Sequence, residues 1–221
     1  MKITKLGLSF VMMVIVSTSV CGNEWKPLFK EDLSDAKFTP GVWTKDAEGV
    51  VTASKDDSLW AVGNYENFEL SLEFKTDNGT NSGVIVYCSD IPNWIPNSVE
   101  VQIYDDSPRR KRQGKADHTC CGAFYGHVAP TKLLVKEPGE WNTMHIRCFG
   151  PKIEVTLNGE KVSQMDMTQW TSARKNPDGT SIPGWLNKPK STLPTKGSIG
   201  FQGKHGASNI YFRNIMIRNA Q

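Results

Sequence analysis

The chain has 221 residues, with 26 Lys and Arg against 23 Asp and Glu, so its formal net charge is only +3. Such a balance gives no support for nucleic-acid binding. The 7 Trp and 9 Phe residues can fill a sizeable core, and a length of about 200 residues after an N-terminal leader still suits one all-β domain.

The first 22 residues have the features of a secretory leader. Lys2 and Lys5 give it a positive start, and the apolar run over residues 6–16 is shorter than the roughly 20 residues that span a bilayer. We therefore predict a signal peptide over residues 1–22, a single domain over residues 23–221, and export to the periplasm or the cell surface.

Cys21 leaves a choice about how the leader is processed. An ordinary signal peptidase would cleave near Cys21 or Gly22, whereas lipidation of Cys21 would anchor the protein to a membrane. The preceding Thr18-Ser19-Val20 is a poor lipoprotein box, since Gly or Ala is expected just before the cysteine. No later segment is long and apolar enough to span a bilayer, so a lipid on Cys21 would be the sole membrane attachment.

The remaining chain reads as a series of strands with almost no helical periodicity. The clearest is 68–75, in which Phe68, Leu70, Leu72 and Phe74 alternate with polar residues, as in a strand with one face in a core. Further strands are expected at 50–52, 59–62, 83–88, 99–105, 141–149, 153–157 and 210–217. The fold class predicted is all-β, an antiparallel two-sheet β-sandwich.

Two local irregularities are also expected. Asn158-Gly159 is the strongest hairpin signal in the chain, because both residues tolerate the positive φ of a tight turn. Ile210 and Phe212 have one parity while Ile215 and Ile217 have the other, so a β-bulge is expected near Arg213-Asn214.

The strand over residues 99–105 carries the most informative pattern. Alternation places Val99, Val101 and Ile103 on one face, suited to a core, and Glu100, Gln102 and Tyr104 on the other. A polar strand face often simply meets water. Here Asn81-Ser82-Gly83, Trp94 and Asp105-Asp106 flank it, and carboxylates, amides and an aromatic ring on one face are what a sugar site requires.

Residues 163–194 break the strand rhythm with repeated Pro and Gly and contain Trp170 and Trp185. Loops of this length are uncommon in compact domains unless they have a function. Either the tryptophans are packed into the sandwich, or the loop walls a binding groove with one of them, preferentially Trp185, as a stacking platform. Asp166 to Ser172 could form one helical turn.

Four cysteines remain beyond the leader. Cys148 is on the apolar face of its strand and is expected to be a buried thiol. Because export permits disulfides, we predict a bond from Cys88 to Cys120 or Cys121. No cysteine spacing matches a zinc site.

A series of short motifs resembles one known family. NSG (81–83) is followed in order by EVQI-x-D (100–105), CGAFYG (121–126), GEWN (139–142), LNG (157–159), GSIGFQGKHG (197–206) and FRNIMI (212–217). This series resembles the 3-keto-disaccharide hydrolase domain of secreted bacterial proteins, a concanavalin-like sandwich long catalogued without a function. Many members carry an arginine shortly after NSG, whereas the nearest position here is Tyr87.

The resemblance implies cleavage of the glycosidic bond of 3-keto-glycosides. A ketone at C3 acidifies the C2 proton, a base removes it, the group at C1 leaves, and water then adds to complete a hydrolysis. A divalent metal ion could hold the developing enolate. We expect Glu100, His205 and His118 to be catalytic, Asp105 to be a metal ligand, and five residues to bind the carbohydrate: Asn81, Trp94, Gln102, Trp185 and Lys204.

The alternative function is a lectin-like carbohydrate-binding module without chemistry, since this fold serves both purposes. A binding module would need only aromatic and amide side chains. The carboxylates and histidine within the motifs favour the enzyme. A laminin-G-like adhesion domain is a third possibility, against which the absence of repeats argues.

Overall fold

The structure is a computed structural model that describes residues 24–221. The predicted signal peptide and Cys21 lie outside the described residues. Within the described part of the chain, no helix is long and apolar enough to cross a membrane.

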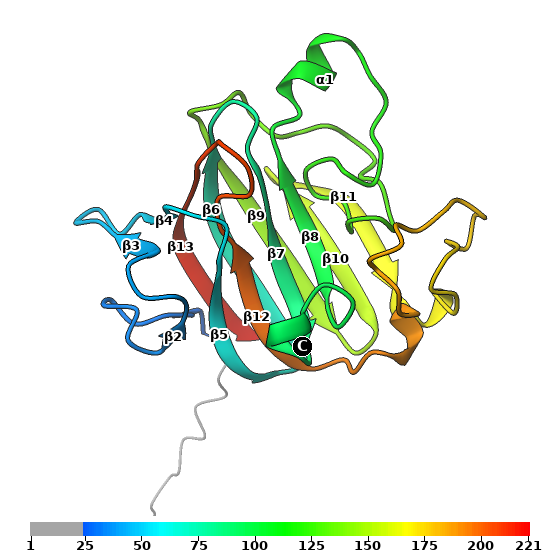
Figure 1. Ribbon diagram of the computed structural model, residues 1–221, viewed down its shortest axis with the longest axis horizontal. Helices are drawn as coiled ribbons and strands as arrows, with labels where there is room; N and C mark the ends of the chain where they lie inside the picture. Colours follow the sequence, from blue (N-terminus) through cyan, green and yellow to red (C-terminus); the bar gives the residue numbers. More distant parts are fainter. Residues whose placement is uncertain (1–23) are drawn as a thin grey trace, which may run out of the picture.

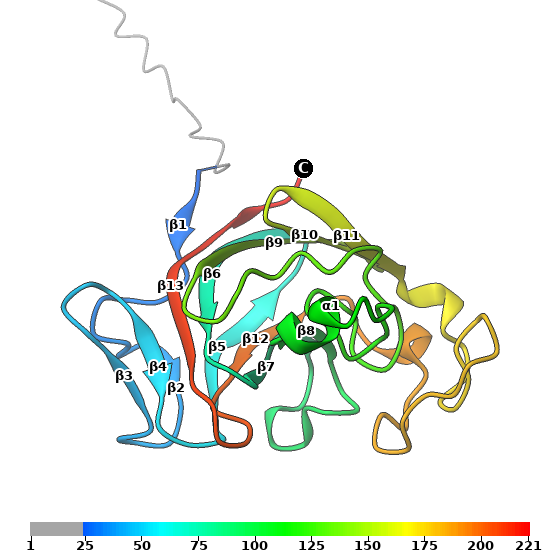
Figure 2. The ribbon, with the colours of Figure 1, turned by 90° about the horizontal axis from the view of Figure 1, so that it is seen from above.

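Two antiparallel sheets form a sandwich, as the alternating pattern predicts (Figures 1 and 2). The larger sheet has the order β11-β10-β9-β6-β13-β4-β3, with β1 paired to β13. Its strands are β1 (Lys26–Pro27), β3 (Trp43–Lys45), β4 (Val51–Ala53), β6 (Phe68–Thr76), β9 (Trp141–Phe149), β10 (Lys152–Leu157), β11 (Glu160–Asp166) and β13 (Ile210–Asn219).

The smaller sheet has the order β2-β5-β12-β7-β8. Its strands are β2 (Ala36–Lys37), β5 (Ser58–Tyr65), β7 (Asn81–Cys88), β8 (Val99–Tyr104) and β12 (Gly197–Gln202). The helical elements are one short helix and three single turns: α1 (Ser107–Lys111), η1 (Ile91–Asn93), η2 (Met167–Gln169) and η3 (Lys190–Thr192). Together these elements confirm the all-β class.

The core lies between the sheets and contains the apolar faces predicted from alternation. Phe68, Leu70, Leu72 and Phe74 from β6 are at most 2% exposed. From the smaller sheet they meet apolar residues that include Val84, Val86, Val99, Val101, Ile103 and Phe201. This burial fixes which face of β8 points outward, and so places Glu100 and Gln102 on the side away from the larger sheet.

The expected turn and bulge are both present. Asn158 and Gly159 have φ of 50° and 86° and connect β10 to β11, which is the double positive φ of a tight hairpin turn. The register of β13 against β6 shifts between Arg213 and Met216, with Asn214 at φ 51°. The bulge explains why the buried residues of β13 change parity along the strand.

The loop predicted from Ser163 begins later than expected. β11 continues to Asp166, and the turn η2 follows within the range where one helical turn was foreseen. Trp170 is buried, and its Nε1 donates to Asn176 Oδ1 at 2.8 Å. Trp185 is 58% exposed, so only one of the two tryptophans is packed into the sandwich.

The predicted disulfide is wrong, because Cys88, Cys120, Cys121 and Cys148 are all free and buried. Val86 pairs with Val99, which places Cys88 near the beginning of β8. Cys121 donates its backbone N–H to Asp106 Oδ2 at 2.9 Å, beyond the end of β8. The thiols therefore lie at opposite ends of the β7–β8 pair.

Candidate functional site

The outward face of the smaller sheet carries a small cavity of about 140 Å³. This is below the roughly 300–1,000 Å³ of pockets for drug-sized ligands and suits a single sugar unit. The loops after β7 and after η2 project on this same side of the molecule (Figure 2). The cavity is lined by Asn81, Trp94, Ile95, Glu100, Gln102, Tyr125, Trp185, Gln202 and His205.

Two glycines let large side chains lie flat on this sheet face. A Cβ on Gly83 of β7 would come within 2.3 Å of Glu100 Oε1, so the Glu100 side chain lies directly across Gly83. A Cβ on Gly200 of β12 would come within 2.5 Å of the Trp60 ring, which in turn meets Trp94 at a centroid distance of 6.4 Å. The glycine of the NSG motif therefore makes room for the carboxylate of Glu100.

Glu100 is the chemically unusual group of the cavity. Burial raises the pKa of its carboxyl to about 7, with the charge of Lys190 opposing the rise and that of Asp56 adding to it. No group within residues 24–221 donates a hydrogen bond to this carboxylate or forms an ion pair with it. A poorly solvated carboxylate that is half-ionised near neutral pH is suited to proton transfer.

Gln102 is two residues further along the same face and is nearly fully buried. Its Nε2 donates to Asn81 Oδ1 at 2.8 Å and to the carbonyl oxygen of Ser82 at 2.9 Å. These bonds fix the amide and leave its carbonyl oxygen as the atom that can accept from a ligand hydroxyl. Asn81 is thereby tied to Gln102 across β7 and β8.

His205 reaches the cavity from the turn that follows β12. Its Nδ1 lies 2.6 Å from Asp56 Oδ2, and both side chains are about half exposed. A carboxylate on one ring nitrogen orients the imidazole and fixes which nitrogen faces the cavity. Because Asp56 holds Nδ1, Nε2 is the atom that can exchange a proton with a ligand.

Aromatic and aliphatic side chains form the rest of the cavity wall. Trp185 from the long loop and Ile95 from the β7–β8 connection are 58% and 41% exposed, and both border the cavity. Tyr125 lies beside them, and burial together with the charge of Glu100 raises the pKa of its phenol. Exposed flat apolar surface beside fixed polar groups suits the C–H face of a sugar.

Three of the predicted site residues are not brought to the cavity. Asp105 is buried, accepting from Gly79 N at 2.9 Å and from Ser107 N at 3.0 Å, so it closes the ends of β7 and β8. His118 and Lys204 do not line the cavity either. The structure therefore does not assemble these three residues at the cavity: the register of β8 turns Asp105 away, and His118 and Lys204 are not part of its lining, so their roles stay predictions.

The donor set does not fit a protein-held metal at this position. Nowhere in residues 24–221 do three or more His, Cys, Asp or Glu side chains gather in a way that could hold an ion. Glu100 and His205 are the two such groups that line the cavity, and the oxygens of Asp105 already accept hydrogen bonds. The predicted role of Asp105 as a metal ligand is therefore not supported by the geometry.

Several residues of the site were missed by sequence analysis. Gln202 has the same parity as Gly200 in the GSIGFQG motif and could have been found from alternation. Tyr125 is in the CGAFYG motif, whose backbone pairs with β8 through Tyr125 N and Glu100 O at 3.0 Å. Asp56 and the buried Lys190 had no local signal, because each acts from a distant loop.

Tyr87, the position nearest the family arginine, does not face the cavity. It is fully buried with φ 56°, packs edge-on against Phe68 and donates its hydroxyl to Gly150 O at 2.9 Å. The positive φ at Tyr87 coincides with the register shift of β12 against β7. Its side chain consequently belongs to the core, and no role of the family arginine passes to it.

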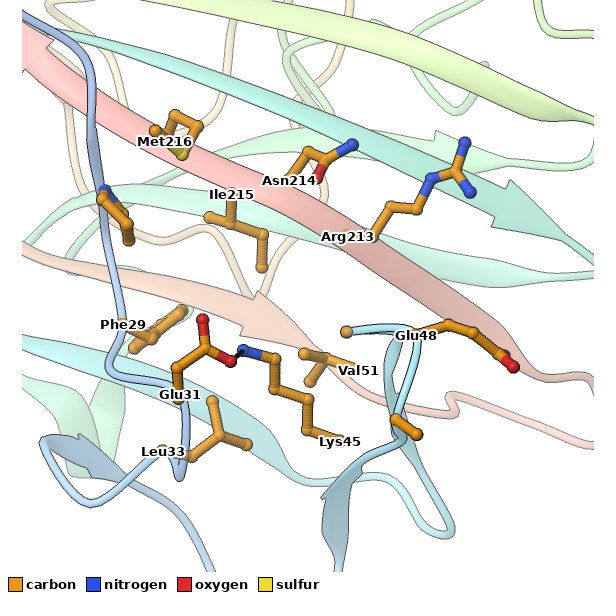
Figure 3. Close-up of a pocket in the computed structure, with 13 residues that line it drawn as sticks. Phe29, Glu31, Leu33, Lys45, Glu48, Val51, Arg213, Asn214, Ile215 and Met216 are labelled. Carbon is orange, nitrogen blue, oxygen red and sulfur yellow. Dashed lines mark hydrogen bonds and ion pairs between the residues drawn. The ribbon is translucent and has the colours of Figure 1, made fainter.

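A larger cavity of about 410 Å³ lies elsewhere, between β13 and the N-terminal segments (Figure 3). Its floor includes Phe29, Val51 and Ile215, and an ion pair of 3.0 Å between Lys45 and Glu31 lies at its side. None of the predicted site residues lines it. We therefore place the candidate active site at the smaller cavity around Glu100.

Comparison with known protein families identifies the family of the chain. A family model described as the 3-keto-α-glucoside-1,2-lyase-like domain matches residues 24–218. The chain belongs to this family. The match confirms the resemblance drawn from the motifs between NSG and FRNIMI.

Individual relatives are consistent with the family assignment. A 3-keto-disaccharide hydrolase of Bacteroides thetaiotaomicron is 25% identical over 173 residues, which is 70% of this chain and 59% of that protein. The chain thus spans about three fifths of that relative. A crystal structure of a candidate glycosyl hydrolase from Parabacteroides distasonis is 57% identical, covers 89% of this chain and 100% of its own, and has a TM-score of 0.84.

The sandwich is also shared by proteins of different function. A carbohydrate-binding module from Bacillus subtilis is 10% identical and has a TM-score of 0.52, covering 86% of this chain and 99% of its own. At this identity the likeness shows the fold alone. Function has to be argued from the cavity and its residues.

Proposed function

We propose that this protein is an exported carbohydrate hydrolase that cleaves 3-keto-glycosides, with Glu100 as the base that removes the C2 proton. The observation that carries the proposal is the Glu100 carboxylate, which lies in a cavity of one-sugar size without a hydrogen-bond donor and with a pKa near 7. The family assignment and the hydrolase relative support the choice of substrate.

In the proposed reaction, Glu100 takes the proton from C2, and the C2–H electrons form a C1=C2 double bond as the C1–O bond breaks. The leaving oxygen takes a proton from His205 Nε2, whose ring is oriented by Asp56 at Nδ1. Water then adds its oxygen to C1 and gives one proton to His205 Nε2, while Glu100 returns the proton to C2, so both groups regain their starting states. The balance is one water consumed and one glycosidic bond broken.

Binding is assigned to the remaining groups of the wall. The carbonyl oxygen of Gln102, fixed through Asn81, accepts from a sugar hydroxyl, and Gln202 offers a second amide. Trp185 and Trp94 supply flat surfaces for the sugar and its leaving group. A requirement for a divalent metal stays a prediction.

The test is turnover of a 3-keto-disaccharide by the wild type and by Glu100→Gln, with and without a chelator. We expect released monosaccharide from the wild type and a loss of about 10²–10⁴-fold in kcat for the variant, the usual contribution of a general base. Thermal unfolding of both proteins controls for the fold. Activity of Glu100→Gln near that of the wild type would remove Glu100 from the mechanism.

A lectin-like module is the second candidate, and the exposed Trp185 beside a shallow polar cavity favours it. It predicts binding of unmodified sugars without turnover of any 3-keto sugar. Calorimetric titration with a disaccharide and with its 3-keto form separates the two. Turnover of the keto form rejects the purely binding role.

A further inference from the structure

Lys190, at the start of η3, is a buried lysine beside β8, the strand that carries Glu100. It is 2% exposed, and its Nζ donates to the carbonyl oxygen of Ser98 at 2.7 Å. No carboxylate in the described chain lies within ion-pair distance of it. Removing an ammonium from water is costly unless its charge is balanced, so a buried lysine with one neutral acceptor requires an explanation.

The position of Lys190 relative to β8 supplies one. Ser98 immediately precedes β8. The backbone groups of Glu100 and Gln102 bond to residues 122–125 at the edge of β8 away from β7, so by the two-residue period the Ser98 carbonyl faces that same edge and holds the ammonium there, two residues from Glu100. The charge of Glu100 is the strongest charge acting on Lys190, and that of Lys190 is the strongest acting on Glu100. The two groups form a separated charge pair without contact.

We propose that Lys190 is a positioning residue that acts through Glu100: its buried charge favours the ionised form of the Glu100 carboxylate while leaving both carboxylate oxygens free. A direct ion pair would also ionise Glu100, but it would occupy the oxygens and depress their basicity. A lysine that does not touch the carboxylate leaves both oxygens free and lowers their basicity less than an ion pair in contact would. The catalytic consequence of this arrangement rests on the proposed function; the electrostatic coupling does not.

The other charged groups around the pair are consistent with this role. Asp56 acts on Glu100 from the β4–β5 connection and opposes its ionisation. His127 is buried, and burial together with the charge of Lys190 lowers its pKa to about 4, so it stays neutral. Lys188 is exposed and reaches Asn97 Oδ1 instead. Lys190 is thus the buried cation that balances Glu100.

The test compares Lys190→Met with Lys188→Met, which removes the same charge from an exposed lysine two residues away. The carboxyl ¹³C signal of Glu100 is titrated by NMR in the full chain, and the pH profile of kcat/KM is recorded beside it. For Lys190→Met we expect the Glu100 midpoint and the acidic limb to move upward by about one pH unit, because a buried charge is weakly screened. At a pH below both midpoints, that shift lowers kcat/KM about tenfold.

Lys188→Met is expected to move the midpoint by far less. An unchanged Glu100 midpoint in Lys190→Met, or equal shifts in the two variants, would overturn the inference. Activity of Lys190→Met should recover as the pH is raised, which a purely structural defect would not produce.

A reciprocal measurement covers the case in which Lys190→Met does not fold. In Glu100→Gln the ammonium of Lys190 loses its negative partner, so its ¹⁵Nζ midpoint should fall, by the same coupling that Lys190 exerts on Glu100. No fall would reject the coupling. Neither titration needs turnover, so a coupled pair in a protein inactive on 3-keto sugars would uphold this inference and reject the proposed function.

Discussion

Two glutamates on the outward faces of the two sheets differ in their hydrogen-bond partners and in the direction of their pKa shifts. Glu69 of β6 accepts from Arg218 Nε at 2.8 Å and from His145 Nε2 at 3.2 Å, and these bonds outweigh its burial and lower its pKa. Glu100 of β8 has no such donors, and burial raises its pKa to about 7. Similar alternating strand patterns therefore produced a carboxylate paired with cations on one sheet and one without a contacting cation on the other.

The difference lies in the cross-strand neighbours. Glu69 pairs with Arg147 on one side and Arg218 on the other, and opposite charges at paired positions stabilise a sheet. Glu100 pairs with Ile85, and its other flank is covered by the backbone of Tyr125. A carboxylate with no cation in contact and with loops over it is destabilising for the fold, as is usual for groups retained for function.

The largest effect is expected from removing the space that Glu100 occupies. In Gly83→Ala the new Cβ would lie 2.3 Å from Glu100 Oε1, so the carboxylate must move. A displacement of about 1 Å costs about 10²-fold in rate, measured as kcat on a 3-keto-disaccharide.

Gly63→Ala is the matched control on the same sheet, because its Cβ would meet only the ring of Tyr65, at 3.1 Å. We expect near wild-type rates for it. Equal losses in both variants would mean that the sheet, and not the position of Glu100, limits activity.

Glu69→Gln should show the opposite behaviour to Glu100→Gln. Replacing Glu69 leaves Arg218 and His145 without their charged acceptor, so the free energy of unfolding should fall by about 1–3 kcal/mol, with kcat unchanged. Urea unfolding of both variants, read beside turnover, gives the comparison. A stable Glu69→Gln protein that has lost activity would contradict the division between the two faces.

The pH dependence of stability should also separate the two carboxylates. Between about pH 4.5 and 7, Glu100 stays protonated in the folded state and ionises in the unfolded state, so its contribution to stability falls as the pH rises. Relative to Glu100→Gln, the wild type should lose up to about 3 kcal/mol of unfolding free energy across this window.

For Glu69 the sign is reversed. Its folded pKa is lowered, so its contribution is present above the unfolded value and is lost as the pH falls through the folded one. Urea unfolding at several pH values from 4 to 7.5 would show both trends. A flat difference between wild type and Glu100→Gln would indicate that Glu100 titrates normally in the folded protein.

The smallest effect is expected at the rim of the cavity. Trp185→Ala removes the exposed ring of the wall and should weaken substrate binding by about tenfold, seen in KM more than in kcat. Phe149→Ala is the control, because Phe149 is 45% exposed but does not line the cavity. If neither variant changes KM, Trp185 is not a stacking platform.

Much of the fold was predictable because strand alternation is local. The burial of Phe68, Leu70, Leu72 and Phe74, the Asn158-Gly159 turn and the bulge at Asn214 followed from parity and turn chemistry. The outward placement of Glu100 and Gln102 followed from the same alternation. Val99, Val101 and Ile103 face the core, so the residues between them face the other side of the sheet.

Tertiary structure decided everything that depends on register and on distant loops. It turned Asp105 into a strand-end cap, kept His118 and Lys204 out of the cavity, and separated Cys88 from Cys121. It also brought Asp56 to His205 and the Lys190 charge to the strand of Glu100, across 149 and 90 residues of chain. No local pattern encodes such pairs, because their geometry exists only once the two sheets and their covering loops have packed.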